Sequence, residues 1–420
     1  MIAKPAAAVL RDAVLVGALA VLTVQALRRH VGDQYPVPSG SMEPTLHGDP
    51  RHGDVVFVRK LARAADCRRH DLVVVAHPTE PGQQLVKRIA ARGDDADACC
   101  IELRDGDVWL GPDPQHLQRE RKDPLERRLR VPWARLGDRG DAGRELFDLQ
   151  ATRAGAAPGV LELPPLQSGP GEARSWFAAA ARTARQAGPR AHPDGCLGTS
   201  QPVDAGFVMA TGVRSAPRDQ LPVRDCGMDL HCVALPNRLL ATVDTHHGAF
   251  TFDWQPRTGQ VALWHDDAEV ATGRLPPVDQ GAHRVEFGHL DDTLFVCVDG
   301  APASLWLVPR QPQWTHQELP RSSWPSPVRT HLHLAALGDT PLRLQRLEVF
   351  RDLFAIRERN AGLPSTPGDW PRLLAPGQWF LLGDHALDSR DSRVFGPVSD
   401  TSFLGRPAAV LGPWPRQRWL

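Results

Sequence analysis

The chain has 420 residues, and its 49 lysines and arginines balance its 49 aspartates and glutamates, so the formal net charge is zero. This balance provides no basic surface for nucleic acid, and we expect no nucleic-acid partner. Hydrophobic residues make up 42% and charged residues 23% of the chain, the proportions of a folded protein with two or three domains. The seven cysteines lack zinc-site spacing, so we expect no metal and no cofactor. A disulfide between two cysteines of the middle region is an alternative that the sequence does not decide.

An apolar segment covers residues 6–27. Its uncharged part, residues 13–24, is shorter than the roughly 20 residues of a spanning helix, but Arg11 and Gln25 can reach the two membrane surfaces. We therefore predict one membrane anchor helix over 6–27, with the lipid bilayer as a partner. A cleaved signal peptide is the alternative, although no small-residue cleavage site precedes Arg28.

A segment rich in proline, glycine and serine follows at residues 35–46. Its composition favours a bent, irregular backbone on which a serine hydroxyl can be exposed and aimed. Ser39 and Ser41 lie two positions apart in this segment. Because serine is a weak nucleophile without a base, a catalytic role requires a base elsewhere in the chain. The alternative is a linker behind the apolar segment.

Strand-like runs follow at residues 53–58, 71–76 and 85–90. In the last run alternate side chains share a face, so Lys87 lies between apolar neighbours and Arg88 points the other way. Burial beside apolar side chains disfavours the ammonium form and lowers the pKa of a lysine, which suits a general base. The alternative is a surface lysine on an edge strand.

The whole pattern predicts a mainly β protein. We predict a catalytic core whose first part is 28–110 and whose second part is 351–420, separated by an irregular connector at 111–204 and an inserted β-sandwich at 205–350. The short, turn-separated strands of the insert resemble jelly-roll modules of the lectin and glucanase type. Its ligand or partner is not identified, and we interpret the pair His246–His247 as ordinary surface or core histidines.

Three separated segments together resemble the type I signal peptidase family of membrane-bound serine-lysine proteases. The nucleophile box of the family is matched by residues 38–46, and its base box by residues 86–89. Its last box, usually Gly-Asp-Asn-x-x-x-Ser-x-Asp-Ser-Arg, is matched by residues 383–393. Residues 385–387 depart from that pattern, with His, Ala and Leu where the family usually has Asn, Arg and a polar residue.

The resemblance implies a role for each matched residue. Ser41 corresponds to the nucleophile and Lys87 to the general base. Ser39 corresponds to the hydroxyl that helps to stabilise the oxyanion, and Ser389 to the serine that orients the lysine amine. The other matched residues correspond to a structural ion pair (Asp391, Arg393 and Arg88) and to shallow apolar pockets for the substrate (Val37, Leu46 and Val86).

The function that the resemblance implies is removal of signal peptides from exported pre-proteins, after an Ala-x-Ala motif. It also implies a single-pass protein of the bacterial inner membrane with its catalytic part on the outer face. One alternative is a membrane-anchored binding protein with a lectin-like sandwich and a vestigial protease core. Another is a self-cleaving serine-lysine protease related to SOS repressors, but those carry a DNA-binding domain in place of the apolar N-terminal segment.

Overall fold

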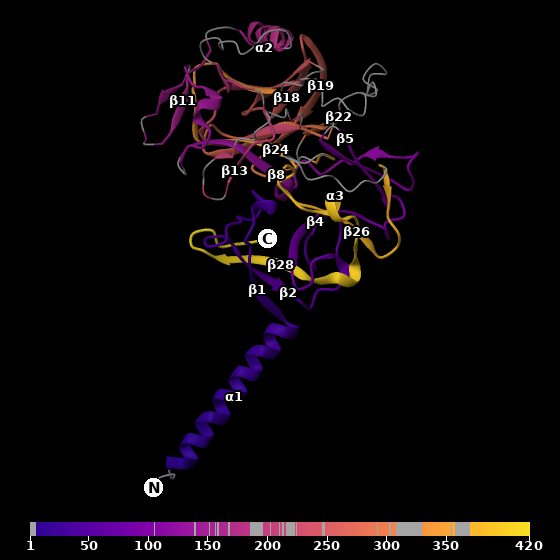
Figure 1. Cartoon of the computed structure of the whole chain (residues 1–420). Coiled ribbons are helices and arrows are strands. Elements are labelled where there is room, and N and C mark those ends of the chain that lie inside the picture. The colour runs from indigo at the N-terminus through magenta and orange to yellow at the C-terminus, as the bar shows by residue number, and fades with distance from the viewer. Residues whose placement is uncertain are drawn as a thin grey trace. The chain divides into compact units, whose positions relative to one another are not determined.

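The chain folds into two compact units in the computed structural model (Figure 1). Unit 1 comprises Met1–Glu102, Val108–Gln118 and Arg357–Leu420, and unit 2 comprises Leu103–Asp107 and Arg119–Ile356. The structure describes residues 6–420 except 105, 138–139, 151, 156, 158, 167–168, 185–195, 202, 210, 212–213, 216–222, 224, 246–247, 292, 302–303, 308–329, 354 and 358–369. The pair His246–His247 therefore lies outside the described residues.

Unit 1 contains the long helix α1 (Ala6–His30), which has three basic residues in its last turn. Cations are favourable at that end of a helix because of the helix dipole. Within the described part of the chain, no helix combines the length and the apolarity needed to cross a membrane. The predicted spanning anchor over 6–27 is therefore not supported.

The main sheet of unit 1 interleaves strands from the two ends of the chain. Its order is β1-β2-β28-β3-β4-β26-β27, with β29 beside β28. The strands are β1 (Gly32–Pro36), β2 (Val55–Arg59), β3 (Leu72–Ala76), β4 (Gln84–Arg92), β26 (Gln378–Leu382), β27 (Val398–Ser399), β28 (Phe403–Gly412) and β29 (Arg418–Trp419). Because β26 pairs with β4, the last motif of the sequence lies beside the strand that carries Lys87.

Short elements complete unit 1. They are the 3₁₀ turns η1 (Gly40–Met42), η2 (Ala64–Asp66) and η6 (Asp400–Ser402), helix α3 (Ser392–Phe395), and a small sheet in the order β25 (Arg372–Leu373), β5 (Cys100–Arg104), β6 (Asp107–Gly111) and β7 (Gln118–Arg119). Two apolar clusters form the core, one around Val37, Met42 and Leu46 and the other around Ile89 and Trp379.

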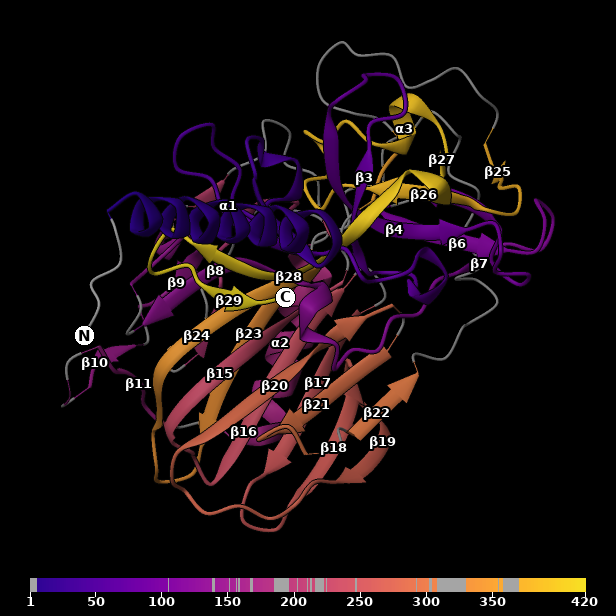
Figure 2. The same ribbon diagram turned by 90° about the horizontal axis from the view of Figure 1, so that it is seen from below.

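Unit 2 contains two large antiparallel sheets (Figure 2). The first sheet consists of β8 (Arg130–Gly137), β10 (Arg153–Ala154), β11 (Leu161–Leu163), β15 (Cys226–Ala234), β20 (His283–Leu290), β21 (Thr293–Val298), β22 (Ser304–Leu307) and β24 (Leu342–Asp352). The second sheet consists of β9 (Phe147–Asp148), β12 (Cys196–Thr199), β16 (Arg238–Thr245), β17 (Gly248–Gln255), β18 (Gln260–His265), β19 (Ala268–Arg274) and β23 (His331–Leu337). Smaller elements are η3 (Arg127–Leu129), η4 (Arg144–Leu146), β13 (Phe207–Val208), β14 (Arg214–Ser215) and α2 (Pro170–Ala184).

The two faces of the second sheet have different neighbours. On one face Phe252 lies edge-on against Phe287 of the first sheet, with 6.1 Å between the ring centroids. On the other face Ala173 and Phe177 of α2 pack with Leu240 and Ala335 in one apolar cluster. Because side chains alternate along a strand, each strand of this sheet presents residues to both environments.

The region 111–204, predicted as an irregular connector, contains regular structure. Strand β8 pairs with β24, and β12 pairs with β23, so both large sheets include strands from this region. Helix α2 lies in it too. These strands are short or interrupted by proline and glycine, and sheet partners far along the chain stabilise them. None of the seven cysteines forms a disulfide.

The chain enters and leaves unit 2 at neighbouring positions. Arg130 at the start of β8 lies opposite Asp352 at the end of β24. An isolated bridge also joins Gly106 to Ala355. The two ends of the inserted region are therefore side by side within unit 2.

Candidate active site

The loop that carries Ser41 is fixed by apolar side chains on both sides of the serine. Val37, Met42 and Leu46 are 4%, 1% and 0% exposed and belong to one core cluster. The backbone N–H of Val37 donates to Asp54 across the base of the loop, at 2.8 Å. Ser41 itself is half-buried on the single turn η1. The buried neighbours thus hold the backbone while the hydroxyl stays accessible.

Lys87 reaches Ser41 from the middle of β4. Its side chain is buried, with the residue 2% exposed, and its Nζ lies 2.6 Å from Ser41 Oγ. A serine hydroxyl within hydrogen-bond distance of a buried amine is the arrangement that a nucleophile and its base require. The alternative of a surface lysine on an edge strand is excluded, since β4 lies between β3 and β26.

The segment 383–389 contacts the same site. A Cβ atom at Gly383 would lie 2.1 Å from Ser389 Oγ and 2.4 Å from the carbonyl oxygen of Ser41, so only glycine fits there. Ser389 is fully buried, and its Oγ has no hydrogen-bond partner among the residues that the structure describes. The structure therefore places Ser389 at the site without the hydrogen bond to the lysine that its predicted role requires.

Asp391 and Arg393 form a buried ion pair behind the site. Arg393 donates from Nε and Nη2 to the two carboxylate oxygens, both at 2.8 Å, and the N–H of Gly383 donates to Asp391 at 3.0 Å. Burial raises the pKa of Asp391, but the charge and hydrogen bonds of Arg393 outweigh it, so the pKa lies below its ordinary value. This pair fixes the segment that contacts Ser41.

Arg88 was predicted to belong to the ion pair of Asp391 and Arg393, but it takes no part in the hydrogen bonds between those two residues. It pairs with Asp384, donating from Nε at 2.7 Å and from Nη2 at 2.6 Å. The reason is the strand alternation already expected: Arg88 points to the opposite side of β4 from Lys87. The predicted set of three residues thus belongs to two ion pairs, and Asp384 is a partner that the sequence alone did not identify.

The predicted substrate-lining residues lie in one cluster. Val37 and Leu46 are buried there, and the partly buried Val86 packs against them. Ser39 is exposed, and its side chain makes no capping hydrogen bond to η1. His385, noted in the sequence only as a departure, donates its backbone N–H to the carbonyl oxygen of Ser41 at 3.3 Å.

Comparison with known proteins agrees with this geometry. Residues 10–128 and 348–412, less than half of the chain, match the family model described as signal peptidase, peptidase S26. The class of protein that these residues define is a serine peptidase. Signal peptidase I of Aquifex aeolicus is 38% identical over 78 residues, which cover 18% of this chain and 29% of that protein. The predicted resemblance to the type I signal peptidases is confirmed, and the chain spans under a third of that relative's length.

Solved structures resemble the chain only distantly. A galectin of Caenorhabditis elegans is 13% identical and matches 30% of this chain and 83% of its own, with a TM-score of 0.22. A galectin of Xenopus laevis is 11% identical and matches 30% of this chain and 92% of its own, with a TM-score of 0.21. Likenesses at these scores carry no argument about fold or ligand.

Proposed function

We propose that this chain is a serine endopeptidase that removes N-terminal signal peptides from exported pre-proteins. Ser41 is the nucleophile and Lys87 the general base. The observation that supports this proposal most directly is the distance of 2.6 Å between Lys87 Nζ and Ser41 Oγ, in a site where the lysine is 2% exposed. The family resemblance of the surrounding residues supports it independently.

The reaction would proceed in two halves. Ser41 Oγ attacks the scissile carbonyl carbon while its proton moves to the free amine of Lys87. The tetrahedral intermediate collapses to an acyl-enzyme, and Lys87 gives the proton to the departing amine of the mature protein. A water molecule then attacks the carbonyl carbon of the ester and transfers a proton to Lys87, which passes it to the departing Ser41 Oγ as the signal peptide is released.

The oxyanion of the intermediate would be stabilised by the backbone N–H of Ser41 and the hydroxyl of Ser39. Ser39 is exposed, so its hydroxyl is free to turn toward a bound substrate. Losing one such donor costs about 10²–10³ in rate. Val37, Leu46 and Val86, which lie in one apolar cluster, correspond to the residues of the family's shallow substrate pockets, where limited space would favour small side chains. The expected cleavage motif is therefore Ala-x-Ala.

We also propose that α1 attaches the enzyme to the lipid bilayer, on the outer face of the bacterial inner membrane. Its apolar side chains are open to solvent: Val16 and Leu19 are 68% and 66% exposed. We expect the full chain to float with phospholipid vesicles. The double variant Leu19→Glu/Leu22→Glu should lose this flotation. Leu61→Glu is a matched control, because Leu61 is 66% exposed elsewhere in unit 1. Equal flotation of all three proteins would contradict attachment through α1.

Cleavage of a pre-protein with an Ala-x-Ala site by the detergent-solubilised chain tests the enzyme. We expect the unmodified chain to cleave it, and Ser41→Ala and Lys87→Met each to lose at least about 10³-fold in rate. Lys60→Met and Ser402→Ala are matched controls, since both residues belong to unit 1 and lie outside the predicted motifs.

Three outcomes would count against the proposal. Cleavage that survives Lys87→Met would place the base elsewhere. Cleavage that survives Ser41→Ala would mean that the nucleophile is another residue. Failure of the unmodified chain to cleave several pre-proteins would favour the binding protein with a vestigial protease core.

A further inference from the structure

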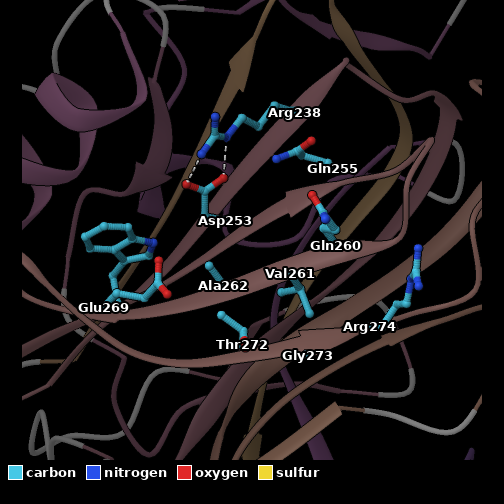
Figure 3. Close-up of a pocket in the computed structure, with 11 residues that line it drawn as sticks. Arg238, Asp253, Gln255, Gln260, Val261, Ala262, Glu269, Thr272, Gly273 and Arg274 are labelled. Carbon is cyan, nitrogen blue, oxygen red and sulfur yellow. Dashed lines mark hydrogen bonds and ion pairs between the residues drawn. The ribbon is translucent and has the colours of Figure 1, made fainter.

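A polar pocket lies on the second sheet of unit 2 (Figure 3). It encloses about 500 Å³, within the range of roughly 300–1,000 Å³ that small-molecule sites occupy. Asp253 lines it and Phe252 faces the first sheet, so the pocket is on the face of β17 directed away from that sheet. No residue with a predicted role lies in it.

The lining side chains are arranged in rows across adjacent strands. Gln255 of β17 lies opposite Gln260 of β18, which lies opposite Arg274 of β19. Arg238, Gln255, Gln260 and Arg274 succeed one another across the pocket in Figure 3. Directly opposite residues have Cβ atoms about 4.5–5.5 Å apart. A ligand lying across the strands would therefore meet one polar side chain at each strand.

A network of charged side chains makes the floor of the pocket rigid. Asp253 is 3% exposed and accepts hydrogen bonds from Arg238, through Nε at 2.5 Å and Nη2 at 2.6 Å. Arg174 of α2 donates to the same carboxylate at 2.6 Å, and its guanidinium lies 3.7 Å from the ring centroid of Trp264. These groups are fixed before any ligand arrives, which reduces the entropy lost on binding.

Other lining groups have unused hydrogen-bonding capacity. The side chains of Gln255, Gln260, Glu269 and Arg274 make no hydrogen bond or ion pair with the residues that the structure describes. The indole N–H of Trp264 is buried and has no acceptor in that same part of the chain. A buried donor without a partner is unusual in a folded protein, and a ligand oxygen would satisfy it.

The charges of the lining define the chemistry of the ligand. Two arginines and two carboxylates line the pocket, and Arg174 pairs with Asp253 from the floor, so the ligand meets charges of both signs and no large excess of either. Amides and carboxylates side by side offer donors and acceptors together, as adjacent hydroxyl groups require.

We propose that this pocket binds a short neutral oligosaccharide. The proposal is independent of the peptidase function, because every residue that carries it belongs to unit 2. Gln260 would donate to and accept from sugar hydroxyl groups, Arg274 would donate to them, and Arg238, held by Asp253, would contribute its remaining N–H groups. An extended peptide paired with β19, the last strand of the sheet, is the competing occupant.

Calorimetric titration of the full chain in detergent with maltotriose, cellotriose, mannotriose and triacetylchitotriose tests the proposal. We expect at least one of them to bind with a dissociation constant below about 10 mM, the strength that a few hydrogen bonds to a preformed site provide. Gln260→Ala and Arg274→Ala should each weaken that binding by about tenfold. Gln345→Ala and Arg343→Ala are matched controls, because these exposed residues lie on β24 of the first sheet.

Three results would overturn the proposal. The first is the absence of binding to all four trisaccharides. The second is binding that both pocket variants retain in full, which would place the ligand elsewhere. The third is binding of unstructured peptides without binding of any trisaccharide, which would assign the site to strand addition at β19. Since both substituted side chains are open to solvent, loss of folding is not expected, and circular dichroism checks it.

Discussion

Each unit contains a buried lysine, and the two have opposite surroundings. Lys87 in unit 1 has a neutral hydroxyl, Ser41 Oγ, at 2.6 Å. Lys122 in unit 2 has a side chain that is 6% exposed and contacts two carboxylates, Asp291 at 3.3 Å and Asp352. Burial alone therefore does not decide what a lysine does.

The partner decides which protonation state is stable. Burial lowers the pKa of Lys122, but the charges of Asp352 and Asp291 outweigh it, and the pKa lies above its ordinary value. Lys122 is thus held as a cation and cannot accept a proton at neutral pH. At Lys87 the contact that the structure shows is with a neutral hydroxyl, Ser41 Oγ at 2.6 Å, and the nearby carboxylate Asp391 is paired with Arg393. A lysine in that setting can act as a base.

Replacing the base should separate activity from stability. In Lys87→Met we expect cleavage to fall by at least about 10³-fold while the free energy of unfolding of unit 1 stays the same or rises. The reason is that an apolar side chain of similar length replaces a buried amine. Amide hydrogen exchange followed peptide by peptide measures unit 1 separately from unit 2. A large loss of protection in unit 1 would show that Lys87 is needed for folding instead.

Lys122→Met should have the opposite effect. At pH 8, above the pKa of about 7 of Asp352, it leaves that carboxylate and Asp291 buried without their cation, which typically costs about 3–5 kcal/mol. We expect hydrogen exchange of unit 2 to accelerate accordingly, and the cleavage rate per folded molecule to be unchanged. Unaltered exchange in unit 2 would mean that the carboxylates do not depend on Lys122. The variant Lys122→Arg, which keeps the charge, is the control.

The two units should also respond oppositely to pH. Burial raises the pKa of Asp225 and of Asp352 to about 7, so these carboxyl groups stabilise unit 2 most below their ordinary pKa of 3.8. That contribution is lost as the pH rises through about 7. The pKa of Asp391 is lowered, so its contribution to unit 1 is present above 3.8 and is lost as the pH falls below that value.

The measurement is hydrogen exchange of each unit between pH 4 and pH 8, corrected for the intrinsic exchange rate. We expect protection of unit 2 to fall across this range and protection of unit 1 to be kept. If the protection of both units changed in the same way with pH, Asp225 and Asp352 could not be the groups that set the pH dependence of unit 2. The charged groups around the two carboxyls of unit 2 are Arg119, Lys122, Asp107, Glu120, Asp291 and His289.

Ser389→Ala should have the smallest effect. Its Oγ is buried without a partner, so removing it should change stability by less than about 1 kcal/mol. If Ser389 orients the amine of Lys87 when substrate is bound, kcat should fall by about tenfold, with KM unchanged and the pH profile displaced. Ser389→Thr, which keeps the hydroxyl, should recover part of the rate. An unchanged kcat in Ser389→Ala would remove this residue from the proposed mechanism.

The sequence allowed the site to be predicted where the signal is local. Strand alternation around Lys87 and the bent segment around Ser41 are read within ten residues, and the structure brings the two side chains together. The pairing of Arg88 with Asp384 could not be read in this way, because the residues lie 296 positions apart and meet only through the register of β4 and β26. The strands of the region 111–204 were not predicted for a related reason. They are short, their residues have little strand propensity of their own, and partners far along the chain stabilise them.

The neighbouring ends of unit 2 bear on how the interrupted unit 1 assembles. More than 200 residues separate β4 from β26, and an unstructured chain of that length would impose a closure entropy that grows by about 0.6 kcal/mol with each doubling. Once unit 2 has folded, the pairing of Arg130 with Asp352 has already brought the two flanking segments together. The segment between β4 and β26 then costs only the closure entropy of a short loop. We therefore expect unit 1 to tolerate the exchange of unit 2 for another module whose two ends are neighbours.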